Sequence, residues 1–288
     1  MRRTIDRTNL EVFAIGLGAM SLSISDRPDD ARAREVLAAA LDVGVNFIDT
    51  ADCYCIDDDH FGHNERLIAS VLREWYRTDD VVVATKGGVT RPRGNWVTNG
   101  RPEHLRAACE ASLQRLGLEG IRLYQLHAPD PDVPFEDSVG ELARLKDEGK
   151  IKHVGLSNVS EEHVRRAQDI VPIASVQNRC NVLEKRDVTN GFVEFCAAQG
   201  LTYIPYSPVG GHNGHVRLAK VDVLNEIADR HETTGYCVAL AWLLAQGEHV
   251  IPIPGASRPE SIRASANTLF VELDGDDLER LNAIPDWT

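Results

Sequence analysis

The sequence predicts an α/β fold and, within that class, a closed (β/α)8 TIM barrel. Eight short apolar runs rich in β-branched residues recur along the 288 residues, and a stretch with helical periodicity follows each of them. No segment rich in proline, glycine or serine divides the chain, and its 43% apolar and 26% charged residues are typical of a globular protein. We therefore expect residues 1–288 to form one barrel domain, although a doubly wound sheet would give a similar order of elements.

The predicted strands are runs of five or six residues, most of which end in a polar residue, glycine or proline. They cover residues 14–18, 45–49, 81–86, 123–127, 153–157, 174–178, 202–206 and 250–254. The predicted helices cover residues 30–42, 64–75, 102–116, 134–148, 161–169, 186–198, 236–246 and 259–266. Gly44 follows the first helix, Pro102 opens the third, and Gly149 and Gly200 close later ones, as helix start and stop signals do. The glycine-rich stretch 210–215 predicts a mobile loop.

The charge balance excludes several partners. With 31 basic and 44 acidic residues the formal net charge is −13, which opposes binding of nucleic acid or anionic lipid across a broad face. No apolar run reaches the roughly 18 to 20 residues that cross a bilayer, and the first residues lack the apolar core of a secretory signal. We expect a cytoplasmic protein without membrane or nucleic-acid partners, whose six cysteines are reduced and mostly pack in the core.

Polar residues interrupt the apolar runs at the ends of successive predicted strands. Asp49, Lys86 and His127 stand there, and in a barrel these ends share the rim where catalytic groups lie. Each alone has a structural reading, as a turn cap, a solvated lysine or a core histidine, but together they favour catalysis. Tyr54 follows Asp49 by five residues. Lys86 is predicted to lower the pKa of Tyr54, Asp49 to hold Lys86, and His127 to hydrogen-bond a carbonyl oxygen.

A series of motifs occurs in a fixed order along the chain. They are IGLGAM at 15–20, FIDTADCY at 47–54, NE at 64–65, ATK at 84–86, QLH at 125–127, GKIKHVGLSN at 149–158 and IPGA at 253–256. Together they resemble the aldo-keto reductase family over nearly the whole chain. The resemblance implies an NAD(P)H-dependent enzyme that reversibly reduces a ketone or aldehyde of a small molecule. Its catalytic tetrad would be Asp49, Tyr54, Lys86 and His127, with Tyr54 as proton donor.

The resemblance also implies contacts with the nicotinamide. Ser157, Asn158 and Gln177 match the residues that bind its carboxamide, since side-chain amides and a hydroxyl suit that donor and acceptor pair. Tyr206 matches the aromatic residue that stacks beneath the ring, and Ser207 follows it.

Three residues implied for the far end of the cofactor precede a predicted helix: Gly255, Ser257 and Arg258. A helix start favours negative charge, and the serine and arginine can hold a 2′-phosphate by charge-assisted hydrogen bonds. This favours NADPH over NADH. Where relatives often have Glu and Asn near the adenine, residues 264–265 are Ala and Ser, so Arg263 and Asn267 are candidates to compensate.

The segment 53–63 has an unusual composition, with two cysteines, two histidines and three aspartates. These are residue types of a zinc site, but a polar loop beside Tyr54 is the favoured interpretation and no metal is predicted. Four residues near the predicted mouth are candidates for substrate contact: Asp52, Cys55, His60 and Trp96.

Two other functions remain open. The first is a cofactor-binding auxiliary or redox-sensing protein with slow turnover. The second is a barrel lyase that uses Lys86 as a Schiff-base nucleophile, a reading that gives no role to Asn158, Gln177 or Tyr206. The sequence specifies neither the substrate nor whether the protein is a monomer or a homo-oligomer.

Overall fold

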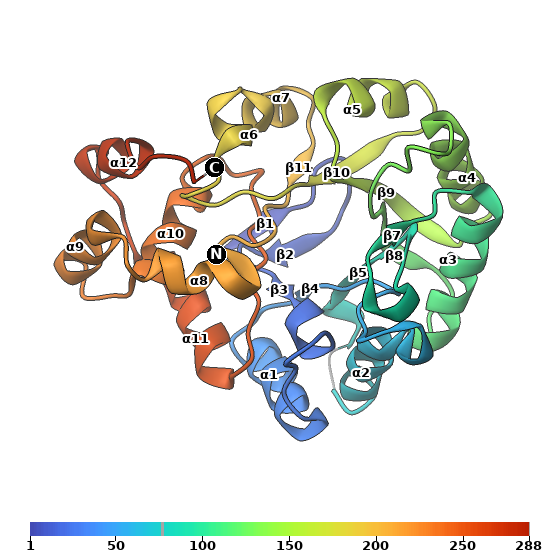
Figure 1. Ribbon diagram of the computed structural model, residues 1–288, viewed down its shortest axis with the longest axis horizontal. Helices are drawn as coiled ribbons and strands as arrows, with labels where there is room; N and C mark the ends of the chain where they lie inside the picture. The colour runs from blue at the N-terminus through green and yellow to red at the C-terminus, as the bar shows by residue number, and fades with distance from the viewer. Residues whose placement is uncertain (76–77, 288) are drawn as a thin grey trace.

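The structure is a computed structural model that describes residues 1–75 and 78–287. Within these residues parallel strands form one sheet in the order β11-β10-β9-β8-β5-β4-β3 (Figure 1). The strands are β3 (Leu17–Gly18), β4 (Phe47–Asp49), β5 (Val82–Gly87), β8 (Ile121–Leu126), β9 (Ile151–Ser157), β10 (Ile173–Gln177) and β11 (Thr202–Tyr203). Sequence neighbours pair throughout this sheet, as expected when each strand returns through a helix on the outside.

The segment 250–255 closes this sheet into a barrel. It pairs in parallel with the β11 segment on one side and with β3 on the other. Gly16 and Gly18 donate their N–H groups to the carbonyls of Pro252 and Pro254, with N···O distances of 2.9 and 3.0 Å. Because the two prolines have no N–H to donate, this eighth strand forms isolated bridges in place of a continuous ladder. The predicted (β/α)8 barrel is confirmed.

Helices surround the ring of strands (Figure 1). They are α1 (Asp30–Asp42), α2 (His63–Leu72), α3 (Pro102–Leu116), α4 (Phe135–Asp147), α5 (Glu161–Gln168), α6 (Arg186–Thr189), α7 (Phe192–Ala198), α8 (Gly211–Leu218), α9 (Asp222–Arg230), α10 (Gly235–Leu244), α11 (Pro259–Asn267) and α12 (Gly275–Asn282). Local signals set several boundaries. Asp29 caps α1 by accepting a hydrogen bond from the Arg32 N–H, and Gly44 follows that helix with φ of +90°.

The structure corrects two predictions made from local composition. The helix predicted at 186–198 is two helices, α6 and α7, because Gly191 between them has φ of +80°. The loop predicted at 210–215 lies largely in α8. Leu218 at its end is fully buried, and the Tyr236 hydroxyl donates to the His215 carbonyl at 3.1 Å, so tertiary contacts stabilise a helix that its glycines disfavour.

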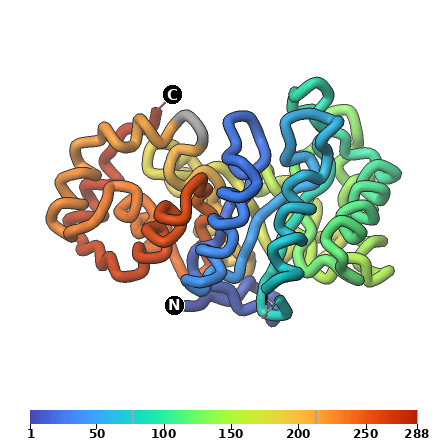
Figure 2. Tube along the Cα trace, turned by 90° about the horizontal axis from the view of Figure 1, so that it is seen from below, coloured from blue at the N-terminus to red at the C-terminus, as the bar shows by residue number. Residues whose placement is uncertain are grey.

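A hairpin covers the amino-terminal end of the barrel. Strands β1 (Arg2–Thr4) and β2 (Glu11–Phe13) pair antiparallel, and they lie at the lower end of the molecule in Figure 2. Ile5 and Val12 from this hairpin pack with Phe47 and other residues inside the barrel. A second hairpin, β6 (Val89–Thr90) and β7 (Val97–Thr98), follows β5. The amino-terminal end of the barrel is therefore closed by apolar packing. The predicted polar site residues lie at the other end, where the strands have their carboxyl termini.

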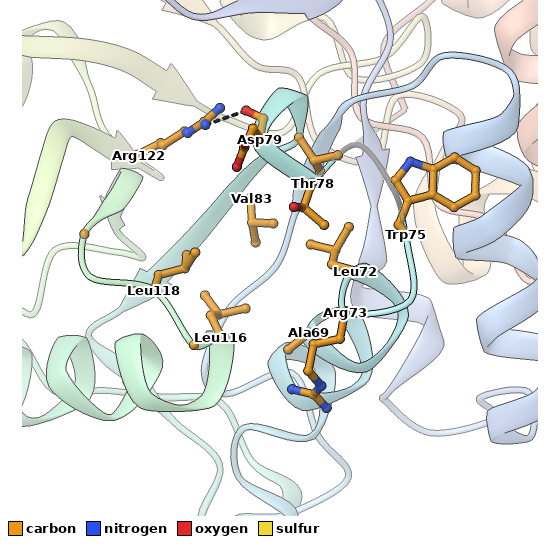
Figure 3. Close-up of a pocket in the computed structure, with 13 residues that line it drawn as sticks. Ala69, Leu72, Arg73, Trp75, Thr78, Asp79, Val83, Leu116, Leu118 and Arg122 are labelled. Carbon is orange, nitrogen blue, oxygen red and sulfur yellow. Dashed lines mark hydrogen bonds between the residues drawn. The ribbon is translucent and has the colours of Figure 1, made fainter.

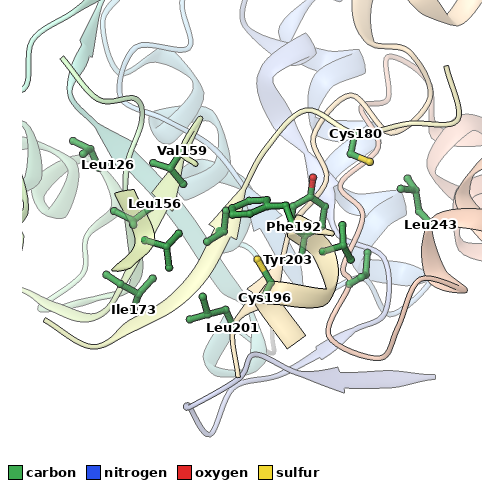
Figure 4. Packing of buried hydrophobic residues seen from close by; sticks show 14 of the residues in the cluster. Leu126, Leu156, Val159, Ile173, Cys180, Phe192, Cys196, Leu201, Tyr203 and Leu243 are labelled. Atoms are coloured by element: carbon green, nitrogen blue, oxygen red, sulfur yellow. The ribbon is translucent and has the colours of Figure 1, made fainter. Parts of the chain in front are cut away.

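A second apolar layer lies between the strands and the helices. Figure 4 shows Leu156 of β9 and Phe192 and Cys196 of α7 within this layer. The Phe192 ring meets the Tyr203 ring edge to face, with centroids 6.4 Å apart. All six cysteines are free and buried, as predicted.

No helix within residues 1–75 and 78–287 is both long and apolar enough to span a membrane.

Candidate functional site

Strand alternation turns the predicted catalytic residues toward the inside of the barrel. Asp49 and Lys86 lie two residues after Phe47 and Ala84, which belong to the interior cluster, so all four side chains point the same way. His127 directly follows β8, beside β5 in the sheet. The carboxyl ends of adjacent parallel strands thus bring together residues far apart in the sequence.

The Lys86 ammonium lies at the centre of this group. Its Nζ donates to Asp49 Oδ2 at 2.6 Å, to the Thr50 carbonyl at 2.9 Å and to the Tyr54 hydroxyl at 3.0 Å. Lys86 is 0% exposed and Asp49 is 2% exposed. A buried lysine is tolerated when its charge is paired and its three donors are satisfied, and both conditions hold here.

Two glutamines hold the other oxygen of Asp49. The Nε2 atoms of Gln177 and Gln125 donate to Asp49 Oδ1 at 2.7 and 3.2 Å, and Gln177 Nε2 also lies 3.3 Å from Gln125 Oε1. Gln125 is a functional residue that sequence reasoning missed. The available signal was its position two residues before His127, which places both on one face of the same strand.

Tyr54 keeps its proton in this environment. Burial raises the pKa of Tyr54 well above its ordinary value, and the negative charge of Asp49 acts in the same direction. The sequence predicts that Lys86 lowers this pKa, but the net shift is upward. The physical reason is that burial and the charge of Asp49 outweigh the effect of the ammonium 3.0 Å from the hydroxyl.

Three rings meet edge to face above Lys86. The centroid of Tyr54 lies 5.7 Å from that of His127 and 6.2 Å from that of Trp96, and the last two are 6.3 Å apart. Trp96, a predicted substrate contact, is 49% exposed, and the Arg91 guanidinium stacks 3.9 Å from its ring centroid. Burial, and then the positive charge of Lys86, lowers the pKa of His127 well below its usual range. His127 is therefore a neutral imidazole beside Tyr54 and Trp96.

The residues predicted to bind the nicotinamide carboxamide lie beside His127. Asn158, at φ of +58°, donates through Nδ2 to the His127 carbonyl at 2.9 Å and to Ser157 Oγ at 3.1 Å. The Tyr206 hydroxyl donates to Asn158 Oδ1 at 2.8 Å. Gln177 is turned to Asp49 by its Nε2, and no residue that the structure describes donates to its Oε1. These hydroxyl and amide groups fit the donor and acceptor pair of a carboxamide.

The predicted phosphate site lies at the start of α11, next to the barrel seam. Gly255 pairs with Gly18 of β3, and the exposed residues Ser257 and Arg258 follow after the buried Ala256. No side chain caps the amino terminus of α11, but its first residue, Pro259, has no N–H and the Ser261 N–H donates to the Arg258 carbonyl at 3.1 Å, so an anion here depends mainly on the side chains of Ser257 and Arg258. Arg258 forms no ion pair with any described residue.

Three residues predicted to contact substrate, Asp52, Cys55 and His60, form their side-chain contacts away from Lys86 and His127. Asp52 is fully buried, and in the described part of the chain its carboxyl group forms no ion pair, while the N–H and S–H of Cys53 are the donors that act on it. Burial, and then the charge of Glu65, raises the pKa of Asp52 well above its usual range. Cys55 is buried, and its Sγ donates to the Cys53 carbonyl at 3.2 Å. His60 is exposed and contacts Asp57 at 2.6 Å. The side chains of these three residues form no hydrogen bond with Lys86 or His127, although the Asp52 N–H donates to the Lys86 carbonyl at 3.3 Å.

A cavity of about 330 Å³ lies outside this rim, near the amino-terminal end of β5. Leu72, Val83 and Leu116 point into it, and Arg122 donates to the Asp79 carbonyl at its edge (Figure 3). This cavity and the candidate site therefore lie at opposite ends of the strands. The candidate site is recognised by its polar residues and not by a cavity. In the described part of the chain, no three His, Cys, Asp or Glu residues are grouped as metal ligands.

Comparisons with known proteins point to one family. The model of the Aldo/keto reductase family matches residues 14–286. A probable aldo-keto reductase of Glycine max is 34% identical over 305 residues, which cover 96% of this chain and 86% of that protein. A thermostable aldo-keto reductase solved with the inhibitor epalrestat has a TM-score of 0.83 and 28% identity, covering 98% of this chain and 99% of its own. The glycerol dehydrogenase of Gluconobacter oxydans has a TM-score of 0.85 and 25% identity, covering 98% and 94%.

Proposed function

Because the chain belongs to the aldo/keto reductase family of oxidoreductases, we propose that it is an NADPH-dependent reductase of small ketones or aldehydes with Tyr54 as proton donor. The observation that carries this proposal is the contact of Lys86 Nζ with both Asp49 and the Tyr54 hydroxyl inside the rim. A buried, protonated phenol next to an ammonium is equipped to protonate an oxygen and then to have its own negative charge compensated.

Each residue of the tetrad has a separate task. A bound nicotinamide supplies the hydride that reduces the carbonyl carbon. Tyr54 transfers its proton to the carbonyl oxygen as negative charge develops there. Lys86 orients the Tyr54 hydroxyl at 3.0 Å and stabilises the resulting phenolate. Asp49 holds Lys86 in place, and neutral His127 donates a hydrogen bond to the same substrate oxygen. Oxidation of an alcohol follows the same path in reverse.

The residues at the rim support a dinucleotide. Ser157, Asn158 and Gln177 would hold the carboxamide, and Tyr206 would lie beneath the ring. The start of α11 carries no side-chain cap, and the exposed Ser257 and Arg258 before it favour a cofactor with a 2′-phosphate. These features support NADPH over NADH.

Lys86 is poorly suited to the alternative role of a Schiff-base nucleophile. That chemistry needs an amine with a free lone pair, whereas Nζ donates three hydrogen bonds and is paired with a carboxylate. The complete Lys86 and Tyr54 pair likewise supports turnover over a purely auxiliary role.

The variant Tyr54→Phe tests the proposal. It removes the proton donor and leaves the rim residues in place, so we expect the rate of carbonyl reduction to fall by about 10²- to 10⁴-fold while NADPH binds with unchanged affinity. The rate is measured as NADPH consumption over a panel of sugars, aromatic aldehydes and ketoacids, and the affinity by NADPH fluorescence.

Tyr236→Phe is the matched control, because among the described residues its hydroxyl bonds the His215 carbonyl of α8 and no other group. Full activity of the Tyr54 variant would remove Tyr54 from the mechanism. Failure of the unmodified protein to bind NADPH or to consume it with any carbonyl would overturn the reductase itself.

A further inference from the structure

The mechanism requires a hydrogen on the ring nitrogen of His127 that faces the substrate. His127 is neutral, because burial and Lys86 lower its pKa, and a neutral imidazole carries only one N–H. The proton can stand on Nδ1 or on Nε2. Only the Nε2–H form can donate from the nitrogen that is not engaged with the protein.

Nδ1 has a partner in the residue directly before Tyr54. The Cys53 Sγ lies 3.4 Å from His127 Nδ1, within hydrogen-bond distance for sulfur, and Cys53 is fully buried. Burial, followed by the charge of Asp52, raises the pKa of Cys53 well above its usual range, so the group is a thiol with one hydrogen to donate. The described residues form no hydrogen bond with His127 Nε2.

Counting donors and acceptors distinguishes the two forms. With the proton on Nε2, the Cys53 S–H donates to the lone pair of Nδ1, and the Nε2–H is left for a ligand. With the proton on Nδ1, that N–H points at sulfur, a weak acceptor, and the S–H is left to the carboxyl group of Asp52, its other acceptor. The first arrangement pairs the Cys53 S–H with the imidazole nitrogen, a stronger acceptor than sulfur, and is therefore favoured.

We propose that Cys53 is a positioning residue whose S–H···Nδ1 hydrogen bond holds the proton of His127 on Nε2, ready for the carbonyl oxygen of the substrate. Cys53 acts through His127 and does not itself touch the reacting atoms. The role of the Nε2–H in reduction rests on the proposed function, but the position of the proton in the resting protein does not.

The position of the proton can be read directly by NMR. In protein labelled with ¹⁵N-histidine, long-range ¹H–¹⁵N spectra show which ring nitrogen is protonated, and His127→Gln assigns the signal. We expect the Nε2–H form in the unmodified protein, the same form in Cys53→Ser, and a shift toward a mixture of both forms in Cys53→Ala. Serine is the conservative variant because its hydroxyl also donates to Nδ1.

Kinetics supply a second readout. Cys53→Ala is expected to lower kcat by about 2- to 10-fold, the size of one neutral hydrogen bond, with little change in KM or NADPH affinity. Cys53→Ser is expected to recover kcat. Cys196→Ala is the matched control, because it deletes an equally buried thiol from α7, away from His127, and changes packing alone.

An Nδ1–H form in the unmodified protein would overturn the proposal, as would an unchanged Nε2–H population in Cys53→Ala. If the protein reduces no carbonyl at all, the spectra still decide the proton position, so failure of the proposed function and failure of this inference are told apart.

Discussion

Glu65 and Asp52 are two buried carboxyl groups near the site that differ in their partners. Glu65 accepts from Thr85 Oγ1 at 2.7 Å and from Arg115 Nε at 2.5 Å, so its charge is paired although it is buried. Asp52 is equally buried, and it forms no ion pair with any residue that the structure describes. Its raised pKa follows, because an unpaired buried carboxylate is more costly than a buried carboxylic acid.

The variant Asp52→Asn is expected to change how stability depends on pH. The folded pKa of Asp52 lies above the unfolded value of about 3.9, so its contribution to stability is fully present below that pH and is lost as pH rises toward the folded pKa. An asparagine has no such loss. The free energy of unfolding of the variant relative to the unmodified protein should therefore rise from pH 4 upward, by at most about 1.4 kcal/mol per pH unit.

Urea denaturation at pH 5 and pH 7 measures this difference. Asp59→Asn, a change at an exposed carboxyl in the same loop, serves as the reference. A difference between Asp52→Asn and the unmodified protein that stays the same at both pH values would show that Asp52 is ionised in the fold.

At the scale of single elements, β9 makes room for the polar layer of the barrel. A Cβ at Gly155 would lie 2.5 Å from Ser175 Oγ and 2.8 Å from Gln125 Cγ. Only a residue without a side chain lets Gln125 reach Asp49 from the neighbouring strand. Gly155 is thus needed because the side chains of Gln125 and Ser175 lie close to its backbone, and not because the chain turns there.

Gly155→Ala is expected to lower the free energy of unfolding by about 1–3 kcal/mol and to lower kcat, because Gln125 and Ser175 must move. Thermal unfolding and NADPH-linked turnover measure the two effects. Gly275→Ala, at the start of α12 where a Cβ meets no atom within 4 Å, should leave stability unchanged or increase it by up to about 1 kcal/mol. Equal stability of both variants would show that β9 has space for a side chain.

At the scale of the whole molecule, the net charge of −13 repels an anionic cofactor, so a binding site must supply its own positive charge. Arg263, one of the candidates near the adenine, is paired with Asp42 at 3.8 Å. Arg258 is exposed and pairs with none of the residues described here. It is therefore the residue on which the proposed preference for NADPH depends.

Arg258→Ala is expected to raise the KM for NADPH by about 10- to 100-fold, the effect of one hydrogen bond to a charged group, and to change the KM for NADH much less. Steady-state kinetics with both cofactors measure this, with Arg263→Ala as the paired-arginine control. A similar rise for both cofactors would place Arg258 away from the 2′-phosphate.

The sequence by itself determined the order of the eight βα units and the position of Asp49, Lys86 and His127 at the ends of neighbouring strands. Strand periodicity turns Asp49 and Lys86 inward, and the ends of neighbouring parallel strands necessarily share one rim. Those are local properties, so they can be read along the chain. Helix α8 could not be predicted in this way, because contacts with distant residues such as Tyr236 stabilise it against its composition.

Only the tertiary structure decided the electrostatics of the site. The pKa of Tyr54 rises because burial and the charge of Asp49 outweigh the neighbouring lysine, and the sequence does not reveal either burial or pairing. The same holds for Gln125 on Asp49 and for Cys53 on His127, which are contacts between different strands and loops. Residue types and order are encoded locally, whereas charge and proton positions depend on which groups the closed barrel brings within a few ångströms of one another.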